Sequence, residues 1–271
     1  MSKPYVSIIL PTYNRANQLP RAIYSVLNQT YENFELIIVD DASKDDTEAI
    51  VSQINDPRIS YIKNQYNCGA AGARNVGIKN ARYDFIAFQD SDDEWMPEKL
   101  AKQMKVMKET DNTIGVVYSE YYYHSVDGTY DGIGPDREIR EKNKSGNVFP
   151  FLLLENLVAT PTILARKEVF DTCGMYKENW KCLEDYEWIL RVSKKYSLLF
   201  INDVLLHVHA NRNCVSNNME AYFHGRCDLY KMYQKEIENF ELKEIILADI
   251  MERAKLTGNV ELVEKLLGID R

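Results

Sequence analysis

The sequence lacks most features that would place it outside the class of ordinary folded domains. Its five cysteines are scattered and without C-x-x-C spacing, so neither a disulfide framework nor a zinc site is indicated. No apolar run reaches the about 20 residues of a transmembrane helix, and strand-like sequence from Tyr5 onward speaks against a signal peptide. We expect a cytoplasmic protein, whose membrane contact, if present, is peripheral at the inner face.

Long basic runs are also missing, and the formal net charge is −8. A nucleic-acid-binding surface needs clustered Lys and Arg to neutralise phosphates. The sequence therefore argues against nucleic acid as a partner.

Short apolar stretches alternate with stretches of helical periodicity. Strand-like segments occupy residues 6–10, 35–39, 59–63, 85–88 and 115–121. Helical spacing occupies residues 19–27, 43–53 and 69–81, and begins again near Pro97. This alternation predicts an α/β fold with a mostly parallel sheet flanked by helices.

The most informative stretch is residues 85–95, where an apolar strand ends in Asp90, Asp92 and Asp93. Crowded carboxylates repel one another unless something positive neutralises them. Hard divalent cations do so and keep coordination positions open for substrate phosphates. The alternative is a solvated acidic turn that caps the helix beginning near Pro97.

Three loops at predicted strand ends carry polar clusters, namely residues 11–15, 40–43 and 90–94. In doubly wound sheets, ligands bind outside the carboxyl ends of the strands. The coincidence of the three loops predicts one ligand site at that edge.

The second half of the chain is less regular. Residues 125–147 form a long polar excursion, which we interpret either as a flap or as a surface loop. From Met219 onward the pattern is helical with mixed charge. The apolar stripe within residues 245–251 would either pack on the core, which we favour, or form a homodimer surface.

Four segments, in this order and at this spacing, resemble the family 2 glycosyltransferases: Ser7–Arg15, Glu35–Ser43, Asn67–Asp93 and Glu184–Trp188. The resemblance implies a GT-A fold and inversion at the anomeric carbon. It implies a catalytic domain over residues 1–215, with a nucleotide-binding part over about 1–120 and an acceptor-binding part over about 121–215. Residues 216–271, which the resemblance does not cover, are expected to form a helical extension.

The resemblance assigns the nucleotide to the first two loops, through residues Pro11, Thr12, Tyr13, Asn14, Arg15, Asp40 and Asp41. The Tyr13 ring suits stacking on a base, although it would also suit a buried strand end. A carboxylate can accept hydrogen bonds from uracil or ribose, and Asp41 is favoured for the base. Helix capping, the alternative role, fits Ser43 or Asp45 better.

The third segment is implied to hold the donor's diphosphate. Asp90-Ser91-Asp92 matches the D-x-D motif, so Asp92 would bind Mn²⁺ or Mg²⁺ and Asp90 the ribose or a metal-bound water. Arg74 would either bind phosphate or pin the acidic loops. His209 is expected to be either a further metal ligand or an ordinary half-buried histidine.

Asp185 resembles the family's catalytic base. Inversion in one displacement needs a base that takes the acceptor hydroxyl's proton on the face opposite the leaving group. Asp185 would also serve as part of the acidic first turn of a helix, and the two roles are compatible.

The predicted activity is metal-dependent, inverting transfer of a sugar from a nucleoside-diphosphate-sugar, most simply a UDP-sugar, to a hydroxyl of a glycan or lipid-linked acceptor. No Q-x-x-R-W segment occurs, so we expect a non-processive enzyme. A nucleotidyltransferase would need a glycine-rich phosphate loop, which Pro11–Arg15 is not. A nucleotide-sugar-binding protein without turnover would not need both Asp92 and Asp185.

Overall fold

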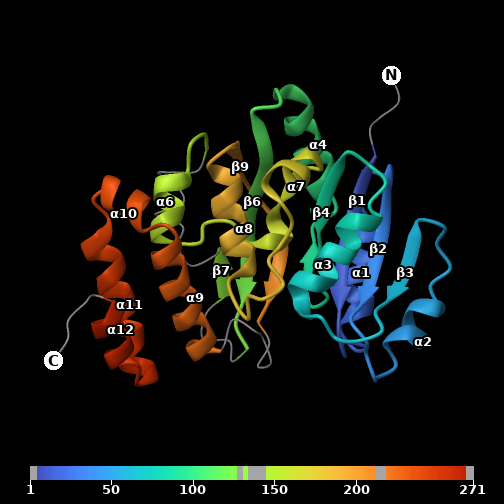
Figure 1. Ribbon diagram of the computed structural model, residues 1–271. Helices are drawn as coiled ribbons and strands as arrows, with labels where there is room; N and C mark the ends of the chain where they lie inside the picture. The colour runs from blue at the N-terminus through green and yellow to red at the C-terminus, as the bar shows by residue number, and fades with distance from the viewer. Residues whose placement is uncertain (1–4, 127–130, 134–144, 211–217, 267–271) are drawn as a thin grey trace.

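The computed structural model describes residues 5–126, 131–133, 145–210 and 218–266 (Figure 1). In this part of the chain nine strands form one sheet, in the order β3-β2-β1-β4-β8-β6-β9-β5 with β7 paired to β6. The strands are β1 Val6–Thr12, β2 Phe34–Asp40, β3 Ile59–Lys63, β4 Phe85–Phe88, β5 Glu94–Trp95, β6 Ile114–His124, β7 Asp131–Ile133, β8 Leu164–Arg166 and β9 Ser197–His209.

The first four long strands are parallel because helices connect them: α1 Leu19–Leu27, α2 Thr47–Ser52 and α3 Gly69–Asn80. β3, β2, β1 and β4 pair in parallel. Beyond β4 the sheet is mixed, since β8 runs antiparallel to both β4 and β6 while β9 is parallel to β6. The predicted α/β fold, a sheet flanked by helices, is therefore confirmed. The parallel pairing that was expected for most of the sheet is found mainly among β1 to β4.

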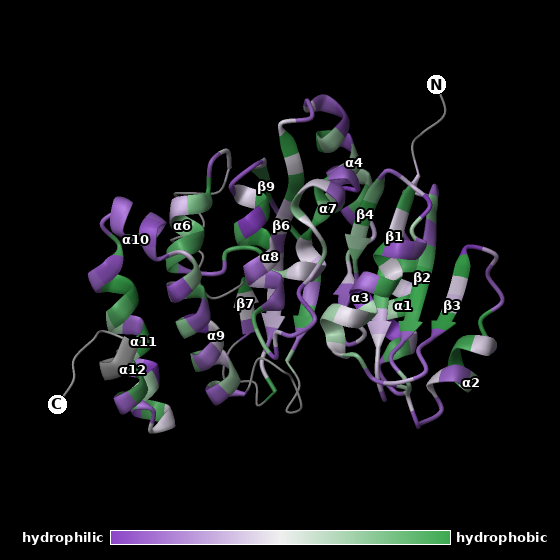
Figure 2. Cartoon of the chain, viewed as in Figure 1, coloured by the Kyte–Doolittle hydropathy of each residue, from purple (hydrophilic) through white to green (hydrophobic). Residues whose placement is uncertain are grey.

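Both faces of the parallel half are covered. Ile8 and Leu10 of β1 point to a core shared with α1 and with α4 (Lys99–Glu109), whereas Ile9 points to the opposite core. Because both faces are buried, the strands are almost continuously apolar, and Figure 2 shows them hydrophobic between polar loops. A Cβ on Gly77 would lie 2.4 Å from Ile9 Cγ2, so glycine lets α3 lie close on β1.

The remaining helices belong to the C-terminal half. They are α6 Phe149–Leu154, α7 Glu168–Cys173, α8 Glu184–Ser193, α9 Met219–Met232, α10 Gln234–Asn239, α11 Lys243–Thr257 and α12 Val260–Leu266. Helices α9 to α12 lie at the end of the molecule opposite β3 (Figure 1). Ile246, Leu247 and Ile250 of α11 are buried, as the packing interpretation of this stripe predicts, while Ile245 is exposed. Nowhere in the described residues is a helix long and apolar enough to cross a membrane.

Part of the polar excursion at residues 125–147 is visible. Strand β7 pairs antiparallel with the end of β6, through Tyr122, Tyr123 and His124. Residues 127–130 and 134–144, which were interpreted either as a flap or as a surface loop, lie outside the described residues.

Candidate active site

A cleft of about 580 Å³ opens at the carboxyl ends of the parallel strands. Strand register explains why three loops meet there, since Thr12 pairs with Asp40 and Ile9 pairs with Phe88, so that the chain leaves β1, β2 and β4 side by side. The predicted site residues that line the cleft are Pro11, Thr12, Tyr13, Arg15, Asp41, Arg74, Asp90, Ser91, Asp92 and Asp185.

Two predicted residues of the nucleotide loops lie behind the cleft instead. Asn14 has left-handed backbone (φ 51°), and its Oδ1 accepts a hydrogen bond from the Lys44 amide at 2.8 Å. Asp40 is fully buried, where it accepts hydrogen bonds from the Ser43 amide at 2.7 Å and from the Tyr61 hydroxyl. Asn14 joins the first loop to the second, and Asp40 fixes the second loop and joins it to β3, so we assign neither side chain a ligand contact.

Asp41 is held at the N-terminus of α3. Its carboxylate accepts hydrogen bonds from the amides of Cys68 (2.9 Å) and Gly69 (2.8 Å) and from Asn64 Nδ2 (2.8 Å). These donors and the helix dipole stabilise the negative charge. Gly69 has φ +78°, a conformation that favours glycine. Asp41 also lines the cleft, so its predicted contact with the nucleotide base stays open to test.

Arg74 joins the acidic loop after β4 to the start of α8. Its Nη2 lies 3.0 Å from Asp90 Oδ1, and its Nη1 lies 2.8 Å from Glu184 Oε1. Burial acts to lower the pKa of this guanidinium, but the two carboxylates outweigh burial and raise it. The ion pairs are those expected of a residue that pins the acidic loops. Arg74 Nε is buried with no hydrogen-bond partner among the described residues, and so is Thr12 Oγ1.

The acidic loop after β4 presents two of its three aspartates to the cleft. The side chains of Asp90 and Asp92 are 29% and 20% exposed. Arg15 Nη2 lies 3.8 Å from Asp92 Oδ2, and Arg21 donates a hydrogen bond to the Asp92 carbonyl. Asp93 is 3% exposed, and burial together with Asp90 and Asp92 raises its pKa. The outward pair is the one that the D-x-D motif predicts.

His209 lies at the end of β9, next to the acidic loop but outside the cleft lining. Its amide donates a hydrogen bond to Asp93 Oδ1 at 3.1 Å, and its ring stacks on His124 at 4.6 Å. Burial, followed by the charge of Arg21, lowers the pKa of His209 to about 4. Its Nε2 is buried and has no hydrogen-bond partner within the described chain. The Glu94 carboxylate faces this nitrogen, with its Oε2 at 3.9 Å. A neutral imidazole whose ring nitrogen makes no hydrogen bond has the chemistry of a metal ligand.

Asp185 stands in the first turn of α8 and lines the same cleft as the nucleotide loops. Leu183, the residue before α8, has left-handed backbone (φ 63°). Asp185 Oδ2 accepts a hydrogen bond from Thr160 Oγ1 at 3.2 Å, and Oδ1 accepts one from the Tyr186 amide at 2.7 Å. Burial, together with the adjacent Glu184 charge, raises the pKa of Asp185 to about 6. That value is well suited to proton transfer near neutral pH.

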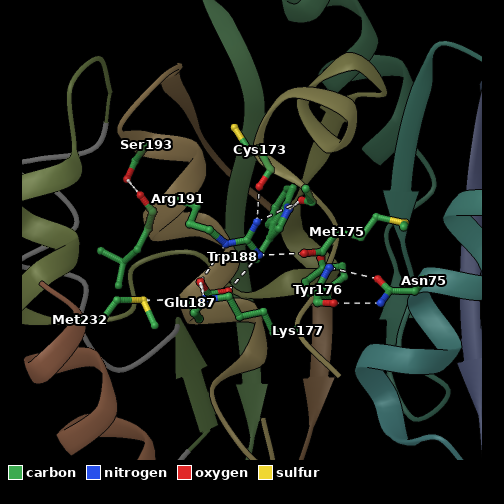
Figure 3. Close-up of polar contacts among 12 residues, drawn as sticks. Asn75, Cys173, Met175, Tyr176, Lys177, Glu187, Trp188, Arg191, Ser193 and Met232 are labelled. Carbon is green, nitrogen blue, oxygen red and sulfur yellow. Dashed lines mark hydrogen bonds and ion pairs between the residues drawn. The ribbon is translucent and has the colours of Figure 1, made fainter. Parts of the chain in front are cut away.

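A polar network holds α8 against α3 (Figure 3). Glu187 is fully buried and pairs with Lys177 Nζ at 2.9 Å and with Arg191 Nε at 2.8 Å. Asn75, next to Arg74 on α3, exchanges hydrogen bonds with the Tyr176 backbone at 2.9 and 3.0 Å. Segment 173–178 therefore connects the helix that carries Arg74 to the helix that carries Asp185.

The cleft also contains residues that the sequence did not reveal. Asn156, from the loop after α6, and Tyr222, from the first turn of α9, both line it. The high tyrosine content, 18 residues, indicates binding surfaces but does not identify any one position. Tyr222 lies in the region that the resemblance does not cover, so no motif points to it.

Solved structures define the fold class. The chain is similar to TarS residues 1–349 of S. aureus, in a structure with UDP-GlcNAc, at a TM-score of 0.68 and 22% identity, over 92% of this chain and 72% of that one. It is also similar to the mannosyltransferase PcManGT of Pyrobaculum calidifontis, in a structure with GDP-Man and Mn²⁺, at a TM-score of 0.68 and 17% identity, over 99% and 75% of the two chains. The fold is therefore of the GT-A type, as predicted.

Sequence relatives define the family. The profile of "Glycosyl transferase family 2" matches residues 7–172. An uncharacterized glycosyltransferase of Rickettsia prowazekii is 32% identical over 88% of this chain and 74% of that protein. The Escherichia coli UDP-Glc:alpha-D-GlcNAc-diphosphoundecaprenol beta-1,3-glucosyltransferase WfgD is 47% identical over 43% of this chain and 45% of that protein. The chain belongs to glycosyl transferase family 2 and is a glycosyltransferase, which confirms the prediction from its motifs.

Proposed function

We propose that this chain is a metal-dependent, inverting and non-processive transferase that moves a sugar from a UDP-sugar to a hydroxyl of a lipid-linked or glycan acceptor. One observation supports this more than any other. Asp90 and Asp92 line the same cleft as Asp185, and Arg74 connects the two walls through Asp90 and Glu184. Inverting transfer needs a diphosphate site and a base on opposite sides of one reacting carbon.

The donor's nucleotide is assigned to the loops after β1 and β2. The Tyr13 ring is 43% exposed at the cleft and is available to stack on a base. Thr12 Oγ1 and Arg74 Nε are buried, have no hydrogen-bond partner among the described residues and belong to residues that line the cleft. Such atoms in a cleft favour a polar ligand. Arg15 adds a positive charge for the diphosphate.

The donor set of the acidic loop fits Mn²⁺ or Mg²⁺. Within the described residues, no three His, Cys, Asp or Glu side chains gather into a metal-binding group. Two carboxylates, Asp90 and Asp92, are hard oxygen ligands that leave further positions for phosphate oxygens. His209, whose Nε2 has no hydrogen-bond partner among the described residues and lies 3.9 Å from Glu94 Oε2, is the proposed additional ligand. When bound, the metal would supply positive charge to the departing diphosphate.

Asp185 is the proposed base. It takes the proton of the acceptor hydroxyl while that oxygen bonds to the anomeric carbon, and the bond from this carbon to the diphosphate oxygen breaks with inversion. Arg74 keeps the Glu184 carboxylate paired, so that Asp185 can lose its proton beside it. Thr160 and the Tyr186 amide orient the Asp185 carboxylate.

The acceptor is assigned to the Asp185 side of the cleft, where Asn156 and Tyr222 lie. The printed name of WfgD specifies a sugar linked to a lipid diphosphate as acceptor, and we propose the same chemical class here. The part of the chain at about residues 1–120 would then bind the donor. The part at about residues 121–215, together with α9, would bind the acceptor.

A thermal-shift panel tests the donor and the metal together. A matching UDP-sugar with Mn²⁺ should raise the melting temperature by about 5 °C at 100 times its dissociation constant, because ligand binding stabilises the folded state by mass action. GDP-mannose, UDP-sugars and each metal alone form the panel. Asp92→Asn should abolish the metal-dependent part of the shift. The absence of a metal-dependent shift with every donor would contradict the proposal.

The pH dependence of transfer tests the base. The raised pKa of Asp185, about 6, means that its carboxylate is protonated below that pH and cannot accept a proton. We expect kcat to fall about tenfold per pH unit below pH 6 and to level off above pH 7. A profile measured between pH 5 and 8 at saturating substrates checks this. A rate that stays constant down to pH 5 would contradict it.

A further inference from the structure

A second hollow lies directly beside the cleft. It measures about 340 Å³, which is within the usual range of small-molecule sites, about 300–1,000 Å³. Trp180, Lys181, His224 and Asp228 line it, and Cys182 lines both the hollow and the cleft. The hollow therefore adjoins the cleft at Cys182, three residues before Asp185, and none of its lining residues comes from the nucleotide loops.

One face of α9 forms the wall of this hollow. Ala221, His224, Gly225 and Asp228 follow the helical spacing i, i+3, i+4 and i+7, and all of them line the hollow. Gly225 has no side chain, and a Cβ there would lie 3.4 Å from the Cys182 carbonyl oxygen. The helix therefore lies close against the segment that leads to Asp185.

A different face of α9 anchors the helix. Arg226 Nη1 donates a hydrogen bond to the Tyr186 hydroxyl at 3.1 Å, and Arg226 pairs with Asp249 of α11 at 3.2 Å. Tyr222, one residue after Ala221, lines the main cleft. Because these contacts of Arg226 fix α9 to α8 and α11, the hollow and Asp185 keep a constant position relative to each other.

The lining of the hollow suits a sugar ring. Trp180 is half-buried and packs on the core while it lines the hollow, so its indole is a fixed apolar surface. The slightly positive C–H groups of a pyranose pack well on the negative face of an aromatic ring. Lys181, His224 and Asp228 are exposed and supply donors and an acceptor for hydroxyl groups.

We propose that this hollow binds the second sugar of the acceptor. The first sugar carries the hydroxyl that receives the transferred sugar beside Asp185, and the second sugar is the one attached to it. The inference rests on the proposed function, because it takes the Asp185 side of the cleft as the acceptor side. Trp180 is the stacking residue, and the polar side chains on α9 select the orientation of the ring. The enzyme would then distinguish an acceptor of two sugars from an acceptor of one.

Kinetics with matched acceptors test the proposal. GlcNAc methyl glycoside and a set of GlcNAc-terminated disaccharide methyl glycosides serve as probes. Trp180→Ala should raise KM for the preferred disaccharide about tenfold, with KM for the monosaccharide and for the donor unchanged. Trp180→Phe should recover most of the loss, and Asp228→Asn should raise the same KM to a smaller extent. Tyr24→Ala, which removes an exposed aromatic ring on α1, is the control and should change nothing.

Equal effects of Trp180→Ala on both acceptor lengths, an effect on donor KM, or no effect at all would overturn the proposal. Direct binding separates it from the proposed function. Indole fluorescence of the full chain should respond to the disaccharides without donor, and Trp180→Phe should remove the response. If no donor is bound or turned over, the proposed function fails, and the fluorescence titration still decides whether the hollow binds sugar. A fluorescence response that persists in Trp180→Phe would place the sugar elsewhere.

Discussion

Asp185→Asn should reduce the transfer rate by about 10³-fold while leaving donor affinity unchanged. The substitution keeps the size of the side chain. The oxygen of the new side-chain amide can still accept the hydrogen bond from the Tyr186 amide, and its NH2 group can donate to Thr160 Oγ1 in place of the second carboxylate oxygen. What it removes is the ability to accept a proton from the acceptor hydroxyl. Turnover assays at saturating acceptor, with calorimetry of donor binding, measure the two effects separately.

Asp203→Asn is the matched control for this variant. Asp203 pairs with Lys102 at the surface, where both side chains are about half exposed, and the substitution should leave both quantities unchanged. Near-normal transfer by Asp185→Asn would rule out the base assignment. Loss of donor binding would instead move Asp185 to the donor side. A wild-type chain that binds donor but transfers to no acceptor would favour the binding protein without turnover.

Arg74→Met should destabilise the fold by about 3–5 kcal/mol. The guanidinium is 8% exposed and is the cation that pairs with both Asp90 and Glu184. Removing it leaves two carboxylates near each other at the base of the cleft, with a third, Asp185, beside them. Like charges in a partly buried place repel strongly and resist ionisation. Urea denaturation at pH 7 measures the loss.

Neutralising the partners should restore much of that stability. The triple variant Arg74→Met, Asp90→Asn, Glu184→Gln removes the unpaired charges together with the cation, so it should be more stable than Arg74→Met alone. Lys63→Met breaks an exposed pair with Glu48 and should have a far smaller effect. A wild-type-like midpoint for Arg74→Met would mean that the two carboxylates do not depend on this arginine.

The parallel half of the fold and the convergence of its loops follow from the sequence because their signals are local. Each of β1, β2 and β4 is an apolar run that ends in polar residues, and parallel strands bring those ends to one edge. The second half carries weaker signals. β8 has three residues and β5 has two, too few to show a period, so their antiparallel pairing emerges only from tertiary structure.

Individual roles in the site were harder to predict from residue type. Asp40 and Asp41 are neighbours with the same side chain. Asp40 accepts hydrogen bonds from Ser43 and Tyr61 away from the cleft, whereas Asp41 lines the cleft. Which one lines the cleft depends on the alternation of β2 and on contacts with residues 21 positions away or more. Tyr222 could not be predicted as a site residue for another reason: it lines the cleft from a helix that carries no recognisable motif.

Non-glycine residues with positive φ concentrate around the cleft. Asn14, Ala42 and Leu183 are three of the four in the described chain, with φ of 51°, 65° and 63°. Each such conformation costs on the order of 1 kcal/mol, which together is a sizeable part of a typical net stability of about 5–15 kcal/mol. For protein engineering, this means that thermostability and loop shape are coupled at these turns. Stabilising substitutions are better sought on the outer faces of α2 and α4, where they leave unaltered the turns that position the loops of the cleft.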